Sequence, residues 1–191
     1  MSNFTVIEGD NGSGKSTLAQ SLKALGFNFV SEDDSLEQMK IAAKKLRGLE
    51  KVQAFYQYNM HTAQKALQVK NSKPPLVVRY WVSTLAAAYA DAVIDFEELK
   101  VHCAANVKKF PLPTMFFYLK CNYGERMKRI AERQKIFGIA DDSRDKKRSE
   151  RYRRAVMEIS FAVPTTWIFI PADEWDCAAV KENVINFLNK I

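Results

Sequence analysis

Apolar residues along the chain fall into short continuous runs separated by longer stretches with helical spacing. Five runs have the length and the β-branched or aromatic content of strands, and they lie at residues 4–8, 27–31, 73–80, 114–120 and 165–170. The run at 114–120, TMFFYLK, is apolar without alternation, as is typical of a parallel strand buried on both faces. Strands that alternate with helices predict an α/β fold, with a five-stranded parallel sheet flanked by helices.

The stretches between these runs have helical spacing. Leu18, Leu22 and Leu25 recur on one face of the first stretch, and Gly26 ends it. Later helical stretches lie at 35–69, interrupted near Gly48, at 82–109, broken near Asp95, and at 123–136, 146–160 and 180–191. The length of the chain predicts a single domain over residues 1–191.

A phosphate-binding motif lies between the first strand and the first helix. Residues 9–16, GDNGSGKS, match GxxxxGK[ST] in full, and we call them the phosphate loop. The glycines allow successive backbone N–H groups to point at a phosphate, and the helix adds the positive end of its dipole. Lys15 would neutralise phosphate charge and Ser16 would ligate Mg²⁺. The predicted phosphate-binding residues are Asn11, Gly12, Ser13, Gly14, Lys15, Ser16 and Thr17.

The net charge of +7 is concentrated in one segment. Residues 120–154 carry 13 Lys or Arg and 6 Asp or Glu, whereas the rest of the chain is neutral. A local basic surplus indicates an anionic partner or a solvated helical face. Nucleic acid and nucleotide phosphates are both candidates, and the phosphate loop favours the nucleotide.

Other features of the composition favour a cytoplasmic protein. Cys103, Cys121 and Cys177 have no CxxC spacing, and reduced thiols fit a reducing compartment. The N-terminus lacks the pattern of a signal peptide, and no apolar run approaches the roughly 18 residues of a membrane span. His61 and His102 stand alone, so we expect no histidine metal site.

Several segments occur in an order that resembles the thymidylate-kinase-like group of P-loop nucleotide kinases over nearly the whole chain. These are VIEGDNGSGKSTLAQSL, Arg79-Tyr80-x-x-Ser83, Arg129-Ile130-x-x-Arg133, ERYRRAVMEIS and IPADEWDCAAVKENVINFL. The resemblance implies a three-layer P-loop kinase fold with a basic lid at approximately 134–150. It also implies ATP and Mg²⁺ as cofactors, and a homodimer in which the Ala-rich helix at 85–92 packs against a partner.

The resemblance implies roles for residues on both sides of the transferred phosphate. Arg79 would bridge the donor and acceptor phosphates, Tyr80 and Ser83 would line the acceptor site, and Tyr89 would limit the space near the sugar. The implied catalytic residues are Lys15, Arg79, Arg133 and Arg144. The implied adenine-side residues are Arg133 and Ala172.

Two further segments allow both a site and a structural interpretation. The stretch 54–64 is similar to the acceptor-side helix of the family, which implies that Tyr56 stacks on the base with Asn59 beside it. The same aromatic residues also suit a helix core. Glu32 is similar to a family glutamate near the acceptor or metal, but it also suits the capped start of a helix.

Three positions depart from the family pattern. Asn11 replaces an aspartate, Met60 replaces an acceptor-binding arginine, and Val78 replaces the carboxylate before Arg79. Because Met60 stands where the family has an arginine, a charge-assisted contact to the acceptor is absent. The loss at Val78 leaves the Mg²⁺-organising acid open, with Asp10, Glu8 and Glu32 as candidates.

These observations favour an ATP-dependent kinase that acts on a nucleoside monophosphate, with a deoxynucleotide as the leading acceptor. An already ionised phosphate acceptor needs no general base, whereas a hydroxyl acceptor benefits from one. The alternatives are a nucleotide-binding regulatory protein that has lost catalysis and a deoxynucleoside or polynucleotide kinase. A nucleotide donor and a small nucleotide acceptor are the expected partners, and we expect neither nucleic acid nor a membrane as a partner.

Overall fold

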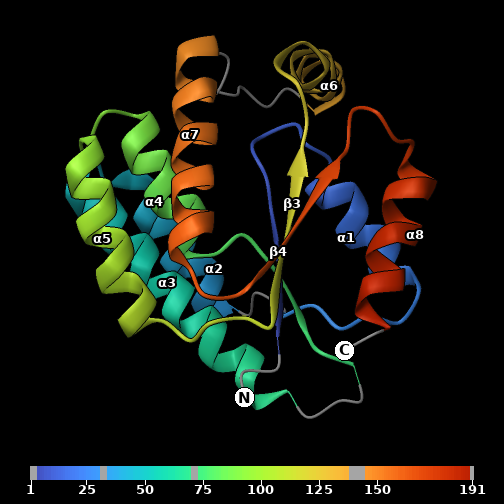
Figure 1. The fold of residues 1–191 in the computed structure, drawn as a ribbon, viewed down its shortest axis with the longest axis horizontal. Coiled ribbons are helices and arrows are strands. Elements are labelled where there is room, and N and C mark those ends of the chain that lie inside the picture. Colours follow the sequence, from blue (N-terminus) through green and yellow to red (C-terminus); the bar gives the residue numbers. More distant parts are fainter. Residues whose placement is uncertain (1–3, 31–33, 70–72, 138–144, 190–191) are drawn as a thin grey trace.

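A parallel sheet forms the centre of the molecule (Figure 1). The computed structural model describes residues 4–30, 34–69, 73–137 and 145–189. The strands β1 (Thr5–Glu8), β2 (Leu76–Val78), β3 (Met115–Lys120) and β4 (Thr166–Pro171) pair in the order β2-β1-β3-β4. All three pairings are parallel, and Val6 of β1 lies opposite Val77 and Phe116.

The prediction of five strands was wrong for the described residues, which form a four-stranded sheet. The described part of the run, residues 27–30, makes only an isolated parallel bridge between Phe29 and Leu76. Two backbone hydrogen bonds support it, from Val30 N–H to the Leu76 carbonyl at 3.0 Å and from Leu76 N–H to the Asn28 carbonyl at 2.8 Å. This run is held at the sheet edge by too few pairings to count as a strand.

Eight helices are described, and they follow the predicted stretches closely. Their bounds are α1 Lys15–Ala24, α2 Asp34–Lys45, α3 Gly48–Gln68, α4 Trp81–Ala90, α5 Phe96–Lys109, α6 Tyr123–Phe137, α7 Lys146–Ala162 and α8 Cys177–Leu188. The breaks expected near Gly48 and Asp95 separate α2 from α3 and α4 from α5. The predicted lid at 134–150 includes the end of α6 and the start of α7, and its middle lies outside the described residues.

Two helical layers cover the sheet, which confirms the three-layer α/β fold. In Figure 1, α1 and α8 lie on one side of the sheet, and α4, α5 and α7 lie on the other. Successive side chains of a strand point to opposite faces. Accordingly, Val6 and Phe116 join the core beneath α4 and α7, whereas Ile7 and Phe117 join the core beneath α1 and α8.

Most of the Ala-rich segment 85–92, which was expected to pack against a dimer partner, is covered within the chain itself. Leu85, Ala86, Ala88 and Ala90 of α4 are buried. The helices α3, α5 and α7 pack against α4, so these side chains are not available to a partner. No helix in the described ranges combines the length and apolar character needed to cross a membrane.

Parallel strands bring their carboxyl ends to one edge of the sheet, where ligands bind in open α/β folds. Here the phosphate loop follows β1, Arg79 follows β2, Cys121 and Asn122 follow β3, and Ala172 follows β4. Residues far apart in the sequence therefore meet at a single edge.

The start of α5 offers a test of the local structure. Asp95 accepts a hydrogen bond from the Glu98 N–H at 2.9 Å, and the Glu98 carboxylate accepts one from the Asp95 N–H at 2.8 Å. Removal of such a cap destabilises a protein by about 1 kcal/mol. We therefore expect Asp95→Ala to lower the free energy of unfolding by about 1 kcal/mol in urea titrations. The matched control Glu97→Ala, in the same exposed turn, should change it by less than about 0.5 kcal/mol.

Candidate functional site

The glycines of the phosphate loop occupy conformations that other residues rarely adopt. Gly9, Gly12 and Gly14 have φ values of 148°, 79° and 96°. A Cβ at Gly9 would lie 2.5 Å from the Ser13 Oγ and 2.9 Å from the Leu119 carbonyl oxygen. The loop therefore needs glycine for both conformation and space.

Lys15 is buried and folds back over the loop that precedes it. Its Nζ donates to the carbonyls of Gly9 at 2.7 Å and Asp10 at 2.8 Å, and to the Ser13 Oγ at 3.3 Å. Burial, reinforced by the Arg79 guanidinium, lowers the pKa of Lys15 well below its ordinary value, against the opposing effect of nearby carboxylates. The Lys15 Nζ is thus held against the loop by three hydrogen bonds.

Glu8 is a buried carboxylate at the end of β1, only 1% exposed. Its Oε1 accepts from the Tyr80 N–H at 2.8 Å, and its Oε2 accepts from the Ser83 hydroxyl. The Tyr152 hydroxyl lies 3.3 Å from the Ser83 Oγ and extends this network to α7. Burial raises the pKa of Glu8 above its ordinary value, although Ser83 and Arg79 oppose the shift.

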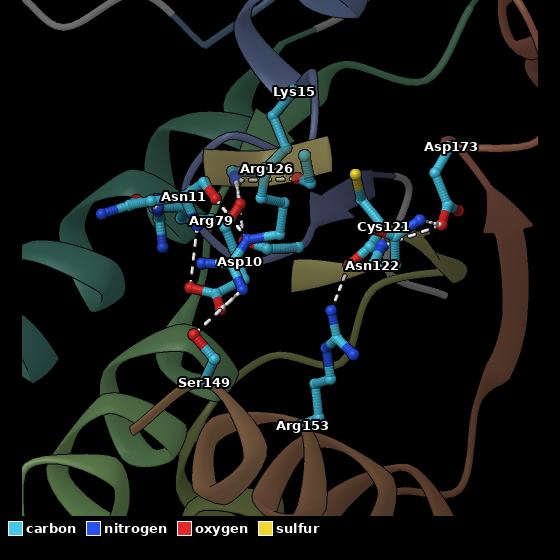
Figure 2. A network of polar contacts seen from close by, with 12 residues as sticks. Asp10, Asn11, Lys15, Arg79, Cys121, Asn122, Arg126, Ser149, Arg153 and Asp173 are labelled. Atoms are coloured by element: carbon cyan, nitrogen blue, oxygen red, sulfur yellow. Dashed lines mark hydrogen bonds and ion pairs between the residues drawn. The ribbon is translucent and has the colours of Figure 1, made fainter. Parts of the chain in front are cut away.

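Arg79 links the end of β2 to the phosphate loop. Its φ of 68° is unusual for a residue with a side chain. Its backbone N–H donates to the Ile7 carbonyl at 3.0 Å, and its Nη2 donates to the Asn11 Oδ1. Figure 2 shows the Arg79 side chain beside Asn11 and Lys15. Backbone conformations of this kind cluster at functional sites.

Asp10 forms a buried ion pair with an arginine that the sequence interpretation did not assign. Arg126, in the first turn of α6, is fully buried, and its Nη1 lies 2.6 Å from the Asp10 Oδ2. Its Nε donates to the Asn11 carbonyl at 2.6 Å, and its Nη1 donates to the Ser149 Oγ at 3.1 Å. The loop is therefore joined to both α6 and α7 (Figure 2).

The residues around the loop fit Mg²⁺ held mainly through phosphates. Mg²⁺ bound with phosphates usually takes only one or two protein ligands and keeps several waters. Ser16, exposed in the first turn of α1, can supply a hydroxyl. Asp10 is engaged by Arg126, and both oxygens of Glu8 accept hydrogen bonds. Within the described ranges, no group of three or more His, Cys, Asp or Glu side chains could hold a metal alone.

A cavity of about 140 Å³ opens beside the loop on the α1 and α8 side. Its lining combines the loop, α1, α6 and the segment after β4, and includes Ser13, Gly14, Thr17, Leu18, Arg129, Ala172, Trp175 and Cys177. Arg129 donates through Nη2 to the Ala172 carbonyl at 3.0 Å and through Nε to Glu125 at 3.0 Å. The predicted adenine-side residue Ala172 lies in this lining, together with Arg129, which the sequence interpretation passed over in favour of Arg133.

Asn122 and Asp173 hold the α6 side of this cavity to the segment after β4. The Asp173 Oδ2 accepts from the Asn122 N–H at 2.9 Å and from its Nδ2 at 2.6 Å. The Asn122 Oδ1 in turn accepts from the Glu125 N–H at 2.9 Å at the start of α6. Although slight burial opposes the shift, the hydrogen bonds from Asn122 hold the pKa of Asp173 below its ordinary value.

Several residues predicted on the acceptor side have side chains in the helical core. Tyr80 is fully buried, and its hydroxyl donates to the Pro111 carbonyl at 3.0 Å. The Tyr56 ring packs edge-on against Phe110 with 5.7 Å between centroids, and burial raises its pKa to about 12. This placement favours the packing interpretation of Tyr56.

The other acceptor-side predictions divide in the same way. Asn59 is buried on α3, and its Nδ2 donates to the Thr84 Oγ1 at 2.9 Å. Tyr89 packs against Phe96 at the end of α4. Arg79 and Ser83 reach the loop and Glu8, whereas Glu32 lies outside the described residues, as does the predicted catalytic residue Arg144 of the lid.

The arginines of α7 explain part of the basic surplus through packing. Arg148 pairs with Asp91 at 2.5 Å, Arg151 donates through Nε to the Tyr89 carbonyl at 3.0 Å, and the Arg154 guanidinium lies 4.2 Å above the Phe96 ring. These residues recur every third position and attach α7 to the junction of α4 and α5. These contacts are intramolecular, so the positive charges of these three arginines stabilise the packing of α7. The basic surplus therefore does not by itself require an anionic ligand.

Comparisons with known proteins identify relatives of the whole fold. A family model described as thymidylate kinase matches residues 7–184. A protein described as thymidylate kinase from Leptospira borgpetersenii serovar Hardjo-bovis (strain L550) is 30% identical over 147 residues, which is 69% of each chain.

Two solved structures share the fold at low sequence identity. The thymidylate kinase from Candida albicans has a TM-score of 0.75 at 15% identity, over 98% of this chain and 91% of that chain. The deoxyadenosine kinase from M. mycoides with bound dATP has a TM-score of 0.67 at 17% identity, over 97% and 98%.

The buried Glu8 carboxyl should make stability depend on pH. Folding raises the pKa of Glu8, so the folded protein holds this proton more tightly than the unfolded chain does. The protonated Glu8 therefore stabilises the fold fully at pH values below the ordinary glutamate pKa. This stabilisation is lost as the pH rises through the pKa of the folded state. Glu8→Gln cannot titrate, so its stability relative to the wild type should be lowest near about pH 4 and should rise toward about pH 8. Urea unfolding across this range measures the difference.

The control for this measurement is Glu50→Gln, at an exposed position on α3. It should follow the pH dependence of the wild type. A constant difference between Glu8→Gln and the wild type at every pH would contradict the prediction.

Proposed function

The chain belongs to the thymidylate kinase family, and we propose that it transfers the terminal phosphoryl group of ATP to a nucleoside monophosphate, with a deoxynucleotide as the acceptor. The observation that carries the proposal is the convergence of Lys15 and Arg79 on the phosphate loop. Phosphoryl transfer depends mostly on positioning and charge neutralisation. A lysine within the loop and an arginine reaching it from β2 supply both.

The donor nucleotide occupies the loop and the adjacent cavity. Backbone N–H groups of the loop and the start of α1 bind its phosphates. Its base enters the cavity beside Arg129, Ala172 and Trp175, where a planar guanidinium and an aromatic ring suit a purine. Mg²⁺, held by Ser16 and the phosphates, would neutralise charge on the phosphate oxygens.

The acceptor approaches Arg79 from the side opposite the donor. A monophosphate is already ionised at neutral pH, so Arg79 can orient it without a nearby proton acceptor. Met60 is partly buried against the core and supplies no second positive charge. The deoxynucleotide assignment draws on the family and on the structural likeness to a deoxyadenosine kinase.

A nucleoside with a free 5′-hydroxyl is the second candidate acceptor. Glu8 favours it, because this carboxylate lies directly before the loop and a hydroxyl acceptor benefits from a general base. The hydrogen bonds that Glu8 already accepts from Tyr80 and Ser83 favour a structural role instead. The monophosphate therefore remains the leading acceptor.

A coupled assay of ADP formation tests this assignment. With Mg-ATP and a panel of ribo- and deoxynucleosides and their monophosphates, we expect one deoxynucleoside monophosphate to give the highest kcat/KM. Lys15→Ala should lower this value by about 10²-fold or more, because it removes phosphate neutralisation in the transition state. The matched control Lys23→Ala, exposed on the same helix, should retain wild-type activity.

The same assay, together with calorimetry of ATP binding, separates the nucleoside kinase and the regulatory protein from this proposal. A nucleoside as the best acceptor supports the Glu8 mechanism. ATP binding without turnover on any acceptor supports a regulatory protein and contradicts the proposal.

A further inference from the structure

Arg126 is a buried arginine that touches two consecutive residues of the phosphate loop. Its Nη1 lies 2.6 Å from the Asp10 carboxylate, and its Nε donates to the Asn11 carbonyl at 2.6 Å. The side chains of both partners of the ion pair are almost fully shielded from water, at 0% and 6% exposure. Solvent therefore screens this interaction little.

Contacts on both sides of Asn11 make its orientation depend on Arg126. The Asn11 carbonyl accepts from Arg126, and the Asn11 N–H donates to the Asp10 Oδ1 at 2.8 Å. The second oxygen of that same carboxylate pairs with Arg126. The two peptide groups that flank Asn11 are thus held, directly or through Asp10, by one guanidinium.

The side chain of Asn11 carries this arrangement to Arg79. Its Oδ1 accepts a hydrogen bond from the Arg79 Nη2. Figure 2 shows Arg126, Asp10, Asn11 and Arg79 as one continuous network. A loop that shifted at Asp10 and Asn11 would move the acceptor for Arg79 as well.

The backbone of α6 also lies directly against the loop. A Cβ at Gly12 would lie 3.0 Å from the Arg126 carbonyl oxygen and 3.1 Å from the Ile130 Cγ1. The first turn of α6 therefore contacts the loop through its main chain and through the Arg126 side chain. The loop and α6 are therefore closely packed at Gly12.

We propose that Arg126 is a positioning residue of the phosphate site, which holds the loop at Asp10 and Asn11 and, through Asn11, aligns Arg79 with the transferred phosphate. The part that concerns Arg79 rests on the proposed phosphotransfer. Arg126 is too deeply buried to contact the nucleotide itself. Its effect on turnover must therefore pass through its neighbours.

Two pairs of variants test whether Arg126 acts through Arg79. In the wild-type background, Arg126→Gln should lower kcat by about 10- to 100-fold, because small misplacement of a catalytic group has effects of this size. The Arg79→Lys variant already lacks the planar guanidinium that Arg126 is proposed to align. In this background, Arg126→Gln should lower kcat by less than about threefold further. An equal fold-loss in the two backgrounds would show a general structural role and overturn the inference.

The control is Arg154→Gln, at an exposed position of α7 outside the predicted lid, which removes the guanidinium that lies 4.2 Å above the Phe96 ring. It should lower the melting temperature while kcat stays within about twofold of the wild type. If Arg126→Gln does not fold, Arg126→Lys replaces it, because an ammonium can pair with Asp10 but lacks the planar fork that also reaches Asn11. Unchanged kcat in a folded Arg126 variant overturns the inference.

Calorimetry of ATP binding separates this inference from the proposed function. If the wild type transfers phosphate to no acceptor, the proposed function fails, but the anchoring of the loop still has a readout. Arg126→Gln should then weaken ATP binding by about tenfold, whereas Arg154→Gln should not. Equal ATP affinity of Arg126→Gln and the wild type would overturn the role of Arg126 in the absence of turnover.

Discussion

The pairing or hydrogen bonding of buried ionisable side chains is the constraint on which the sheet edge with the phosphate loop depends. Glu8, Asp10, Lys15 and Arg126 are all buried there. An unpaired charge in such surroundings is strongly destabilising, whereas a paired and hydrogen-bonded one is tolerated. Here Arg126 neutralises Asp10, Lys15 is held by loop carbonyls, and Glu8 accepts from Tyr80 and Ser83. These contacts allow several ionisable groups to lie buried close together at this edge.

The sheet makes this density of charge possible, because it is parallel. Four carboxyl ends meet at one edge, and each is followed by a segment that contributes polar groups to the network. The helices α6 and α7, which come later in the sequence, complete this polar network through Arg126, Ser149 and Tyr152. A functional site built from segments this far apart in the chain is only as ordered as the packing of those two helices.

The sequence predicted those features whose signal is local. The phosphate loop has a motif, the strands have apolar runs, and Arg79 stands directly after a strand. The prediction of a strand at 27–31 was wrong because strand formation depends on pairing with the neighbouring strand β2, which the apolar run alone does not reveal. Tyr56 has no local signal that separates stacking on a base from packing on Phe110. Arg126 and Arg129 could not be distinguished from the other cations of residues 120–154, because only the register of α6 against the loop separates them.

The contacts of Arg126 with two other segments also constrain which substitutions this protein can tolerate. Asp10 of the phosphate loop and Ser149 of α7 both contact the guanidinium of Arg126 in α6. Loss of the arginine alone leaves a buried carboxylate unpaired, and loss of the aspartate alone leaves a buried cation unpaired. Substitutions at positions 10 and 126 should therefore occur together in divergent relatives, for instance to a pair of uncharged residues. The two positions are expected to covary rather than to change independently.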